Sequence, residues 1–316
     1  MPSVITVGEL LVEIMRTDVD VGFDEMGTFA GPFPSGAPAN FVDCVARLGV
    51  SAGIVGAVGN DAFGRFVVDR LARDGVDTSQ IRTRDDDTTG VAFVSYASDG
   101  SREFIFHLAN AAAGTVGPAA VDSSSVVDAD VVHVAGSSLL ATESMREACY
   151  EVVDLANANG TLVSFDPNVR PELLGDGAER DLLLPILERA DVVTPTEEEL
   201  SFLANVEPDS DSGDAVESLL DAGISTVAVT QGAAGCTIYT ADDIVAQPGF
   251  DVEVVDPTGA GDAFAAAVVV GHIEGQSLEA LATFANATGA LAVTERGPME
   301  GLADRPQVDA LVDTVR

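Results

Sequence analysis

The segment Asp256-Pro-Thr-Gly-Ala-Gly-Asp262 places two carboxylates around small residues, directly before an Ala-rich stretch. Gly259, Ala260 and Gly261 carry little side-chain bulk, so their backbone N–H groups can converge on an anion at a helix N-terminus. Beside such donors, the Asp262 carboxylate suits a general base that deprotonates a hydroxyl attacking a phosphoryl group. The same carboxylate is equally suited to a helix cap, whose only role is to accept hydrogen bonds from backbone donors. The residue types alone leave both interpretations open.

The chain contains no lysine, so all 15 of its basic residues are arginine. A P-loop kinase needs its Walker lysine, and a protein kinase needs its strand lysine, to hold phosphates. Both classes are therefore excluded, whereas an anion hole made of backbone amides requires no lysine.

The charge balance is strongly acidic, with 52 Asp and Glu residues and a net charge of −37. Such a chain should repel nucleic acid and anionic membrane surfaces. At about 1 M salt the Debye length is only about 3 Å, and self-repulsion is largely screened. We therefore expect a halophilic enzyme; an acidic protein of ordinary salt tolerance is the alternative.

The chain carries no apolar run of membrane-spanning length and no basic signal-peptide region before its first strand, which predicts a cytoplasmic location. Cys44, Cys149 and Cys236 lie far apart without CxxC spacing, which favours buried small hydrophobic residues over disulfides or zinc ligands.

Short β-branched runs alternate with stretches of helical period, which is typical of a parallel sheet with crossover helices. The expected strands are residues 4–7, 52–58, 131–135, 162–165, 191–194 and 226–230. The expected helices are residues 39–48, 63–74, 144–158 and 262–271. The pattern predicts a doubly wound α/β sandwich.

Two segments, about 10–33 and 88–108, show alternation and turn residues but no helical period. The second predicts a β-hairpin, with strands at 91–96 and 102–107 and a turn at 98–100. We expect one domain over residues 1–316, with these strands forming a lid at the carboxyl edge of the main sheet.

Several ordered motifs resemble those of one family. The segment from Asp256 to Phe264 resembles the C-terminal signature of the ribokinase (pfkB) family of carbohydrate kinases. Ser35-Gly-Ala-Pro-Ala-Asn40, followed by Leu48-Gly49, resembles the N-terminal signature. Further matches occur in order at 56–64, 165–170, 230–235 and 284–286. The resemblance covers essentially the whole chain. It implies a ribokinase-like three-layer α/β/α sandwich with a small β-strand lid, and an enzyme that uses ATP and Mg2+ to phosphorylate a sugar.

The resemblance also implies catalytic roles. Asp262 would take the proton of the sugar hydroxyl, and the amides of Gly259, Ala260 and Gly261 would hold the transferring phosphoryl group. Arg170 would be a cation near the phosphates, assisted by Asn168; the alternative is a surface partner for one of many carboxylates.

Nucleotide and metal positions follow from the same resemblance. ATP would be bound by Asn168, Thr196, Thr230, Gly232, Gly235, Thr258, Gly261 and Asn286. The family usually has Asn-x-x-Glu where this chain has Thr196 and Glu199. Glu199 would hold Mg2+ through water, and Thr196 in place of Asn would change the hydrogen bonds around the metal-bound water. The alternative is that the acidic residues only begin a helix. A K+ site of backbone carbonyls is also expected, near Asp256, Thr258 and residues 293–298.

The expected sugar contacts are Gly36, Asn40, Glu13, which stands where many relatives carry Asp, and the lid residues Phe106 and His107. The motifs look most like those of fructokinases. Kinases of 2-keto-3-deoxygluconate are the alternative, but they typically carry Tyr-Tyr-Arg in the lid, where this chain has Ile105-Phe106-His107. A neutral ketose is therefore favoured. The lid phenylalanines are also expected to suit packing within the lid or a homodimer formed through it.

Two other classes remain as alternatives. The first is a catalytically silent sugar-binding or nucleotide-binding protein on this fold. An intact Asp262 argues against it. The second is a dinucleotide-dependent oxidoreductase, which the absence of a GxGxxG motif after the first strand disfavours.

Overall fold

The computed structural model describes residues 2–98, 101–174, 179–204 and 212–315. The strands are β1 (Val4–Val7), β2 (Leu11–Val19), β3 (Phe29–Ser35), β4 (Ala52–Gly59), β5 (Ile81–Arg84), β6 (Gly90–Tyr96), β7 (Arg102–His107), β8 (Val131–Ala135), β9 (Leu162–Asp166), β10 (Val192–Val193), β11 (Thr226–Thr230), β12 (Gly235–Tyr239) and β13 (Ile244–Pro248). The helices are α1 (Ala37–Arg47), α2 (Ala62–Arg73), α3 (Ser123–Val127), α4 (Gly136–Ala141), α5 (Glu143–Asn159), α6 (Pro171–Leu174), α7 (Glu179–Leu187), α8 (Glu197–Ala204), α9 (Ser212–Asp221), α10 (Ala260–Ile273), α11 (Leu278–Ala292) and α12 (Arg305–Val312).

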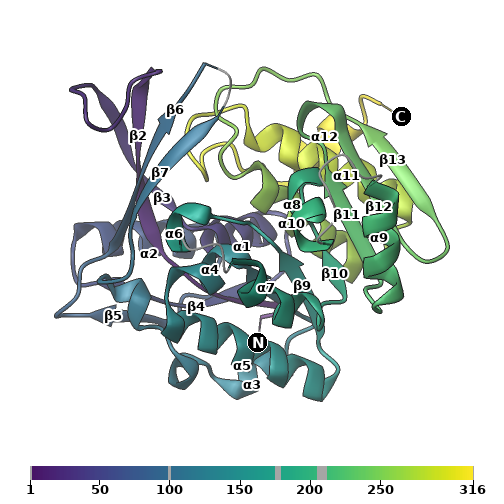
Figure 1. Cartoon of the computed structure of the whole chain (residues 1–316), viewed down its shortest axis with the longest axis horizontal. Helices are drawn as coiled ribbons and strands as arrows, with labels where there is room; N and C mark the ends of the chain where they lie inside the picture. Colours follow the sequence, from purple (N-terminus) through teal and green to yellow (C-terminus); the bar gives the residue numbers. More distant parts are fainter. Residues whose placement is uncertain (1, 99–100, 175–178, 205–211, 316) are drawn as a thin grey trace.

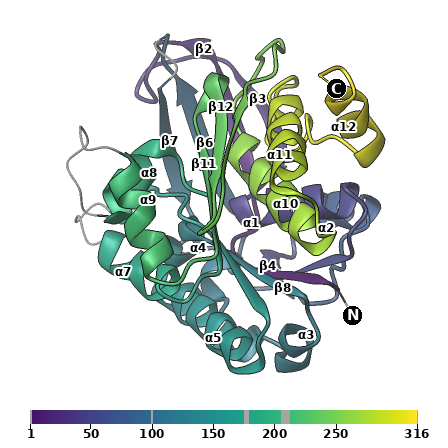
Figure 2. The same cartoon turned by 90° about the vertical axis from the view of Figure 1, so that its right-hand side faces the viewer.

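Nine of the described strands form one mixed sheet, in the order β13-β12-β11-β10-β9-β8-β1-β4-β5. Among these nine strands, β12 runs in the opposite direction to the other eight. Helices cover both faces of the sheet, with α1, α10 and α11 on one side and α5, α7, α8 and α9 on the other (Figure 2). The predicted three-layer α/β/α sandwich is therefore confirmed.

Alternation along the central strands supplies both cores. Val4 of β1 and Ile54 of β4 pack in the core under α1 and α10, while Ile5 and Val55 pack in the core under α5. Because both faces of these strands are covered, the strands read as continuous apolar runs.

A second sheet, in the order β3-β2-β6-β7, stands off the main sheet (Figure 1). Its strands come from the two segments in which the sequence showed no helical period. The predicted hairpin is present as β6 and β7, and residues 99 and 100 of its predicted turn lie outside the described residues. We call this four-stranded sheet the lid.

The six strands and four helices predicted for the sandwich are all present, although β10 is shorter than the predicted strand 191–194. The predicted helix at 262–271 begins earlier, at Ala260, because Gly259 ends the preceding turn in a left-handed conformation with φ 85°. No helix among the described residues is long and apolar enough to cross a membrane.

Candidate active site

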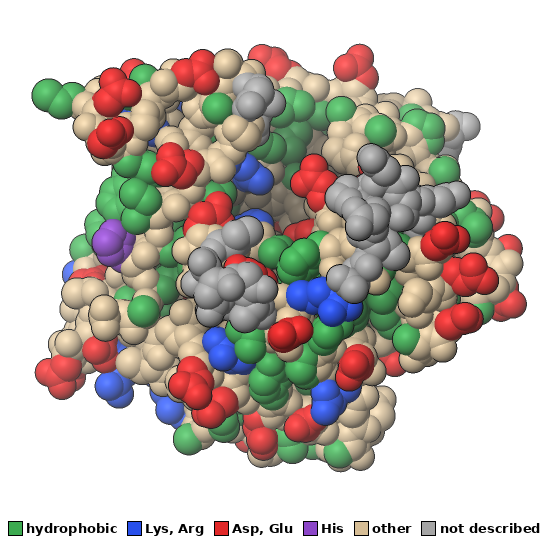
Figure 3. Space-filling view, in the orientation of Figure 1, with side chains coloured by type: hydrophobic (Ala, Val, Ile, Leu, Met, Phe, Trp, Pro, Cys, Tyr) green, Lys and Arg blue, Asp and Glu red, His purple; other side chains and the backbone are tan. Residues whose placement is uncertain are grey.

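A cavity of about 830 Å³ lies between the lid and the carboxyl edge of the main sheet. Figure 3 shows this region as a hollow with basic side chains inside it, and every basic side chain of this chain is an arginine. Ligands of open α/β sheets bind at this edge, because the loops that follow several strands converge there. The predicted site residues that line the cavity are Glu13, Gly36, Asn40, Phe106, Asn168, Arg170, Thr196, Glu199, Thr230, Gly232, Gly235, Thr258, Gly259, Ala260, Gly261, Asp262 and Asn286.

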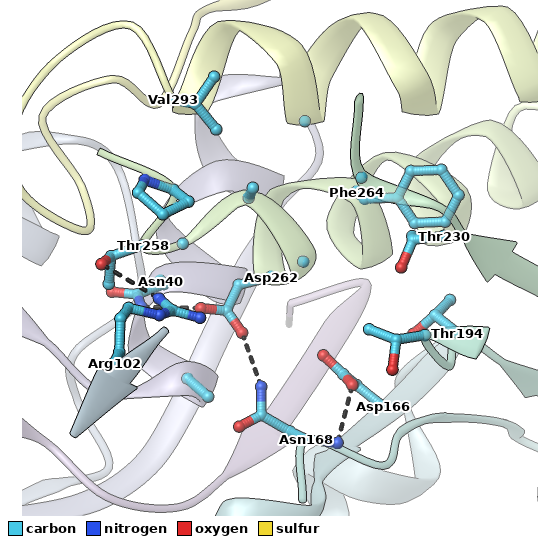
Figure 4. Close-up of a pocket in the computed structure, with 18 of the residues that line it drawn as sticks. Asn40, Arg102, Asp166, Asn168, Thr194, Thr230, Thr258, Asp262, Phe264 and Val293 are labelled. Carbon is cyan, nitrogen blue, oxygen red and sulfur yellow. Dashed lines mark hydrogen bonds between the residues drawn. The ribbon is translucent and has the colours of Figure 1, made fainter. Parts of the chain in front are cut away.

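Asp262 lies in the first turn of α10 and points into the centre of the cavity (Figure 4). Its carboxylate accepts hydrogen bonds from Asn40 Nδ2 at 2.8 Å and from Asn168 Nδ2 at 3.4 Å. The N-cap of α10 is Gly259, and no side-chain hydrogen bond caps the helix. The helix-cap interpretation of Asp262 is therefore wrong, because its two oxygens face side chains of other elements.

Burial raises the pKa of Asp262 to about 6, against the opposing effects of the Asn40 hydrogen bond and the Arg170 charge. A carboxylate with a pKa near neutrality is better matched to general-base chemistry than an exposed aspartate is. At pH 7 most molecules still carry the charged form that can accept a proton.

The N-terminus of α10 offers backbone donors to the cavity. Gly259 needs its left-handed conformation, and a Cβ there would also collide with the carbonyl oxygen of Pro298. A Cβ at Gly261 would meet open space, so this position faces the cavity without obstruction. The Ala260 N–H makes one long hydrogen bond, to the Pro257 carbonyl oxygen at 3.4 Å, and the other first-turn N–H groups together with the helix dipole favour an anion at this place.

Glu13 of β2 and Asn40 of α1 lie at the lid end of the cavity. Glu13 is 6% exposed; its Oε1 accepts from Ser35 at 3.0 Å, and its buried Oε2 has no partner among the described residues. Burial, more than the nearby charges of Asp256 and Asp262, raises the pKa of Glu13 to about 7. An unpartnered buried oxygen in a cavity is an acceptor for a ligand hydroxyl.

The backbone next to Glu13 and Asn40 requires a glycine at position 36. Its φ is 118°, and a Cβ would collide with the backbone oxygen of Glu9. Glu9 itself is a cavity residue that the sequence reasoning missed. Its two oxygens accept from Ser137 at 2.7 Å and from Ser138 at 2.6 Å. Its position two residues after the end of β1, at the carboxyl edge, was a usable signal.

The predicted sugar contact at His107 is wrong. Side chains alternate along β7, so Arg102, Phe104 and Phe106 face the cavity while His107 faces outward and packs edge-on against Phe93 at 6.1 Å. The same alternation turns both phenylalanines inward, so they are not the exposed dimer contacts that the sequence suggested.

Two arginines from different segments of the chain line the cavity. Arg102 comes from the lid and was not predicted as a site residue, whereas Arg170 follows β9. Their guanidinium groups lie 5.6 Å and 5.8 Å from the ring centroid of Phe104. Burial, followed by the charge of Arg170, lowers the pKa of Arg102. Neither arginine forms an ion pair with a carboxylate of the described residues, so the surface-pairing alternative for Arg170 is not seen.

Two acidic residues line the cavity beside Asn168. Glu199 Oε1 accepts from the Val169 amide at 2.8 Å, and its Oε2 accepts from the Thr196 amide at 2.9 Å. Thr196 Oγ1 in turn accepts from the Glu199 amide at 3.2 Å, which completes a capping box at the start of α8. The predicted helix start is thus confirmed, and it coexists with a carboxylate on the cavity wall.

Asp166, at the end of β9, is the second acid and was missed as a site residue. Burial first, and then the charges of Glu199 and Asp262, raise the pKa of Asp166 well above its ordinary value. A divalent cation would relieve this repulsion, so the donor set fits Mg2+ held through water and substrate phosphates. The described residues contain no group of three or more His, Cys, Asp or Glu side chains that could bind a metal by themselves.

The far end of the cavity is more apolar. Thr230 ends β11 and faces the cavity near Thr194 and Phe264 (Figure 4). Asn286 of α11 lines the wall and donates from Nδ2 to the carbonyl oxygen of Pro248 at 2.7 Å, which leaves its Oδ1 as an acceptor. Val293 also lines the cavity, and its carbonyl oxygen accepts from the Val255 amide at 2.8 Å and from the Asp256 amide at 3.2 Å.

Asp256 does not line the cavity. Its carboxylate is buried and accepts from Thr258 and from the Gly297 amide. Through these hydrogen bonds, the Asp256 side chain connects the loop that contains Thr258 to the loop that contains Gly297. A K+ ion at this place would therefore have to be held by backbone carbonyl groups.

The model of the pfkB family carbohydrate kinases matches residues 1–305. Fructokinase-1 of Oryza sativa subsp. japonica is 35% identical over 319 residues, covering 98% of this chain and 98% of that protein. A structure from E. coli, described as a "putative Ribokinase II" in complex with ATP and Mg2+, is 41% identical with a TM-score of 0.91, covering 99% of this chain and 100% of that one. A fructokinase from Xylella fastidiosa with bound ATP is 30% identical with a TM-score of 0.87, covering 100% of this chain and 99% of that one.

Proposed function

The chain belongs to the pfkB family of carbohydrate kinases, and we propose that it transfers the γ-phosphoryl group of ATP to a hydroxyl of fructose. The observation that carries the proposal is the placement of Asp262. This buried carboxylate stands between the Asn40 amide on the lid side and the backbone N–H groups at the start of α10. A base and an anion hole are then adjacent on one helical turn.

In the proposed reaction, the sugar occupies the lid end of the cavity, with hydroxyls bonded to Glu13 and Asn40. Asp262 accepts the proton of the attacking hydroxyl. The N–H groups of Gly259, Ala260 and Gly261 stabilise charge on the phosphoryl oxygens as the group is transferred. Because phosphoryl transfer has a loose transition state, positioning and charge stabilisation supply most of the catalysis.

ATP would occupy the other end, along Thr230, Gly232 and Gly235, with its base near Asn286. Bound Mg2+ supplies neutralisation of the phosphate charge. The residues that would hold it are Glu199, through water, and Asp166. We also propose a K+ site of backbone carbonyl groups beside Asp256 and residues 293–298.

A sugar acid such as 2-keto-3-deoxygluconate is the second candidate substrate. The observation that favours it is the pair of cavity arginines, Arg102 and Arg170, neither of which is ion-paired within the described part of the chain. A guanidinium pair suits a carboxylate better than it suits a neutral ketose. Fructose remains the first candidate substrate because relatives that cover nearly the whole chain are named fructokinases.

The test of function is ATP turnover by the full chain at molar KCl with fructose, other ketoses, ribose and 2-keto-3-deoxygluconate. The proposal expects the highest kcat/KM with fructose. The highest kcat/KM with the acid would replace fructose by the second candidate. No turnover with any sugar or sugar acid would contradict the kinase assignment for this site.

We further propose a homodimer formed through the outer face of the lid. Phe29 and Ile105 are exposed on it, and Phe29 packs edge-on against Phe93 at 6.3 Å. Ile105 lies directly opposite Phe93 in the register of β6 and β7. Light scattering of wild type and of Ile105→Glu would test the proposal; a wild-type monomer would contradict it.

A further inference from the structure

The lid touches the loop in front of the anion hole through one cross-strand pair. Tyr96 ends β6, Arg102 begins β7, and the two residues lie directly opposite each other. The Tyr96 hydroxyl donates to the carboxylate of Asp256, with oxygen distances of 3.2 and 3.3 Å. Arg102 donates to Thr258 Oγ1 at 3.3 Å (Figure 4). Two neighbouring lid side chains thus form hydrogen bonds to two residues of a single loop.

Asp256 connects this lid contact to the two loops that flank the anion hole. Its Oδ1 accepts from the Thr258 amide at 3.0 Å and from Thr258 Oγ1 at 2.7 Å. Its Oδ2 accepts from the Gly297 amide at 3.0 Å. The residue after Thr258 is Gly259, and Gly297 precedes Pro298, whose carbonyl oxygen lies against Gly259. Displacement of the Asp256 carboxylate would therefore move the start of α10.

We propose that Tyr96 and Arg102 form a latch through which closure of the lid over the sugar sets the position of the anion-hole amides. The inference rests on the proposed kinase function, and it makes Tyr96 a positioning residue. Tyr96 does not line the cavity, whereas Arg102 does. A change at Tyr96 therefore tests the latch without removing a side chain that could contact the sugar.

The chemistry of the contact fits this role. A phenol that donates to a carboxylate forms a charge-assisted hydrogen bond, which is stronger than a neutral one. The hydroxyl lies 3.2 Å and 3.3 Å from the two carboxylate oxygens, so the contact is shared between both of them. Burial and the charge of Asp256 raise the pKa of Tyr96, so its hydroxyl keeps its proton at any working pH.

Tyr96→Phe removes only the hydroxyl and leaves Asp256 bonded to Thr258 and Gly297. We expect kcat for sugar phosphorylation to fall about 10- to 100-fold, the range that follows from one hydrogen bond to a charged group. The KM for the sugar and the KM for ATP should each change less than about 3-fold, because neither substrate touches Tyr96.

The matched control is Tyr150→Phe. The Tyr150 hydroxyl also makes one hydrogen bond, to the Leu182 carbonyl oxygen at 2.8 Å, and Tyr150 does not line the cavity. It should leave kcat unchanged. Three outcomes would overturn the latch: an unchanged kcat in Tyr96→Phe, the same loss in Tyr150→Phe, or a raised sugar KM with normal kcat.

A second readout does not need turnover. Amide hydrogen exchange of Tyr96→Phe should be faster than in wild type at residues 256–259 and 293–298, and unchanged in α5. Unchanged exchange in both loops would overturn the latch even if the protein proved to phosphorylate no sugar. Absent turnover in wild type would instead count against the proposed function.

Discussion

Asn40 Nδ2 donates to Asp262 Oδ2 at 2.8 Å, although the two residues are 222 positions apart in the sequence. The bond joins α1, whose start is shaped by Gly36, to the first turn of α10. It orients the carboxylate and stabilises its charged form. The two signature segments of the chain therefore meet at the carboxylate to which we assign the proton transfer.

Activity should depend on pH through Asp262. Its pKa is raised to about 6, and only the charged form can accept a proton, so kcat/KM should fall about 10-fold per pH unit below pH 6. A pH–rate profile from pH 4.5 to 8 measures this limb. A limb near pH 4, the ordinary aspartate range, would show that burial does not perturb the base.

Asn40→Ala should move that limb to higher pH. The Asn40 hydrogen bond lowers the pKa of Asp262, so its removal raises the pKa and reduces the fraction of charged base at neutral pH. Asn60→Ala is the control, since Asn60 donates to Asp85 at the surface at 2.8 Å. An acidic limb that stays in place in Asn40→Ala would refute the electrostatic role of this bond.

Arg102→Gln should separate the two candidate substrates. If a sugar acid is bound by the arginine pair, its kcat/KM should fall about 100-fold or more, because a charged partner is lost in a buried site. Fructose should lose about 10-fold or less. Arg82→Gln, at a surface position that donates to the Ala119 carbonyl oxygen, is the control. Equal losses for both sugars would remove the argument for the acid.

The stability of the fold should rise with salt. Acidic side chains are spread over the face shown in Figure 3, and the net charge is −37, so screening of repulsion should raise the unfolding midpoint between about 0.5 and 2 M KCl. NaCl at equal ionic strength should give the same contribution from screening, so any additional stabilisation in KCl would come from K+ bound at the proposed site. A midpoint independent of salt would contradict the halophile proposal.

The same pair of salts tests the K+ site. At matched ionic strength screening is equal, so kcat should be higher in KCl than in NaCl only if a selective cation site supports the anion hole. Equal kcat in both salts would count against the K+ proposal while leaving the salt dependence of stability intact.

Much of the site could be predicted because it lies in local sequence. The Gly-Ala-Gly-Asp262 turn and the apolar strands carry their own signals, and the structure puts them at one edge of one sheet. The error at His107 was avoidable, since Phe106 and His107 are adjacent in a strand and cannot share a face. The same alternation pointed to Arg102.

Other features carried no local signal. The contact of Tyr96 with Asp256 joins residues 160 positions apart, and it depends on where the lid sits. β13 was not predicted because its residues are partly exposed and include Gln247 and Pro248, so the strand lacks an apolar run. The raised pKa of Asp166 arises from burial beside residues of two other segments, which only the fold brings together.

The central claim is that Asp262 is the catalytic base, and Asp262→Asn tests it most directly. The asparagine oxygen can still accept from Asn40, and loss of a buried charge whose pKa is raised in the fold should not lower stability at pH 7. Asp242→Asn, at an exposed position between β12 and β13, is the control. We expect Asp262→Asn to lose about 10²–10⁴ in kcat while it binds ATP normally and unfolds no earlier than wild type. Near-normal kcat in this folded variant would contradict the account.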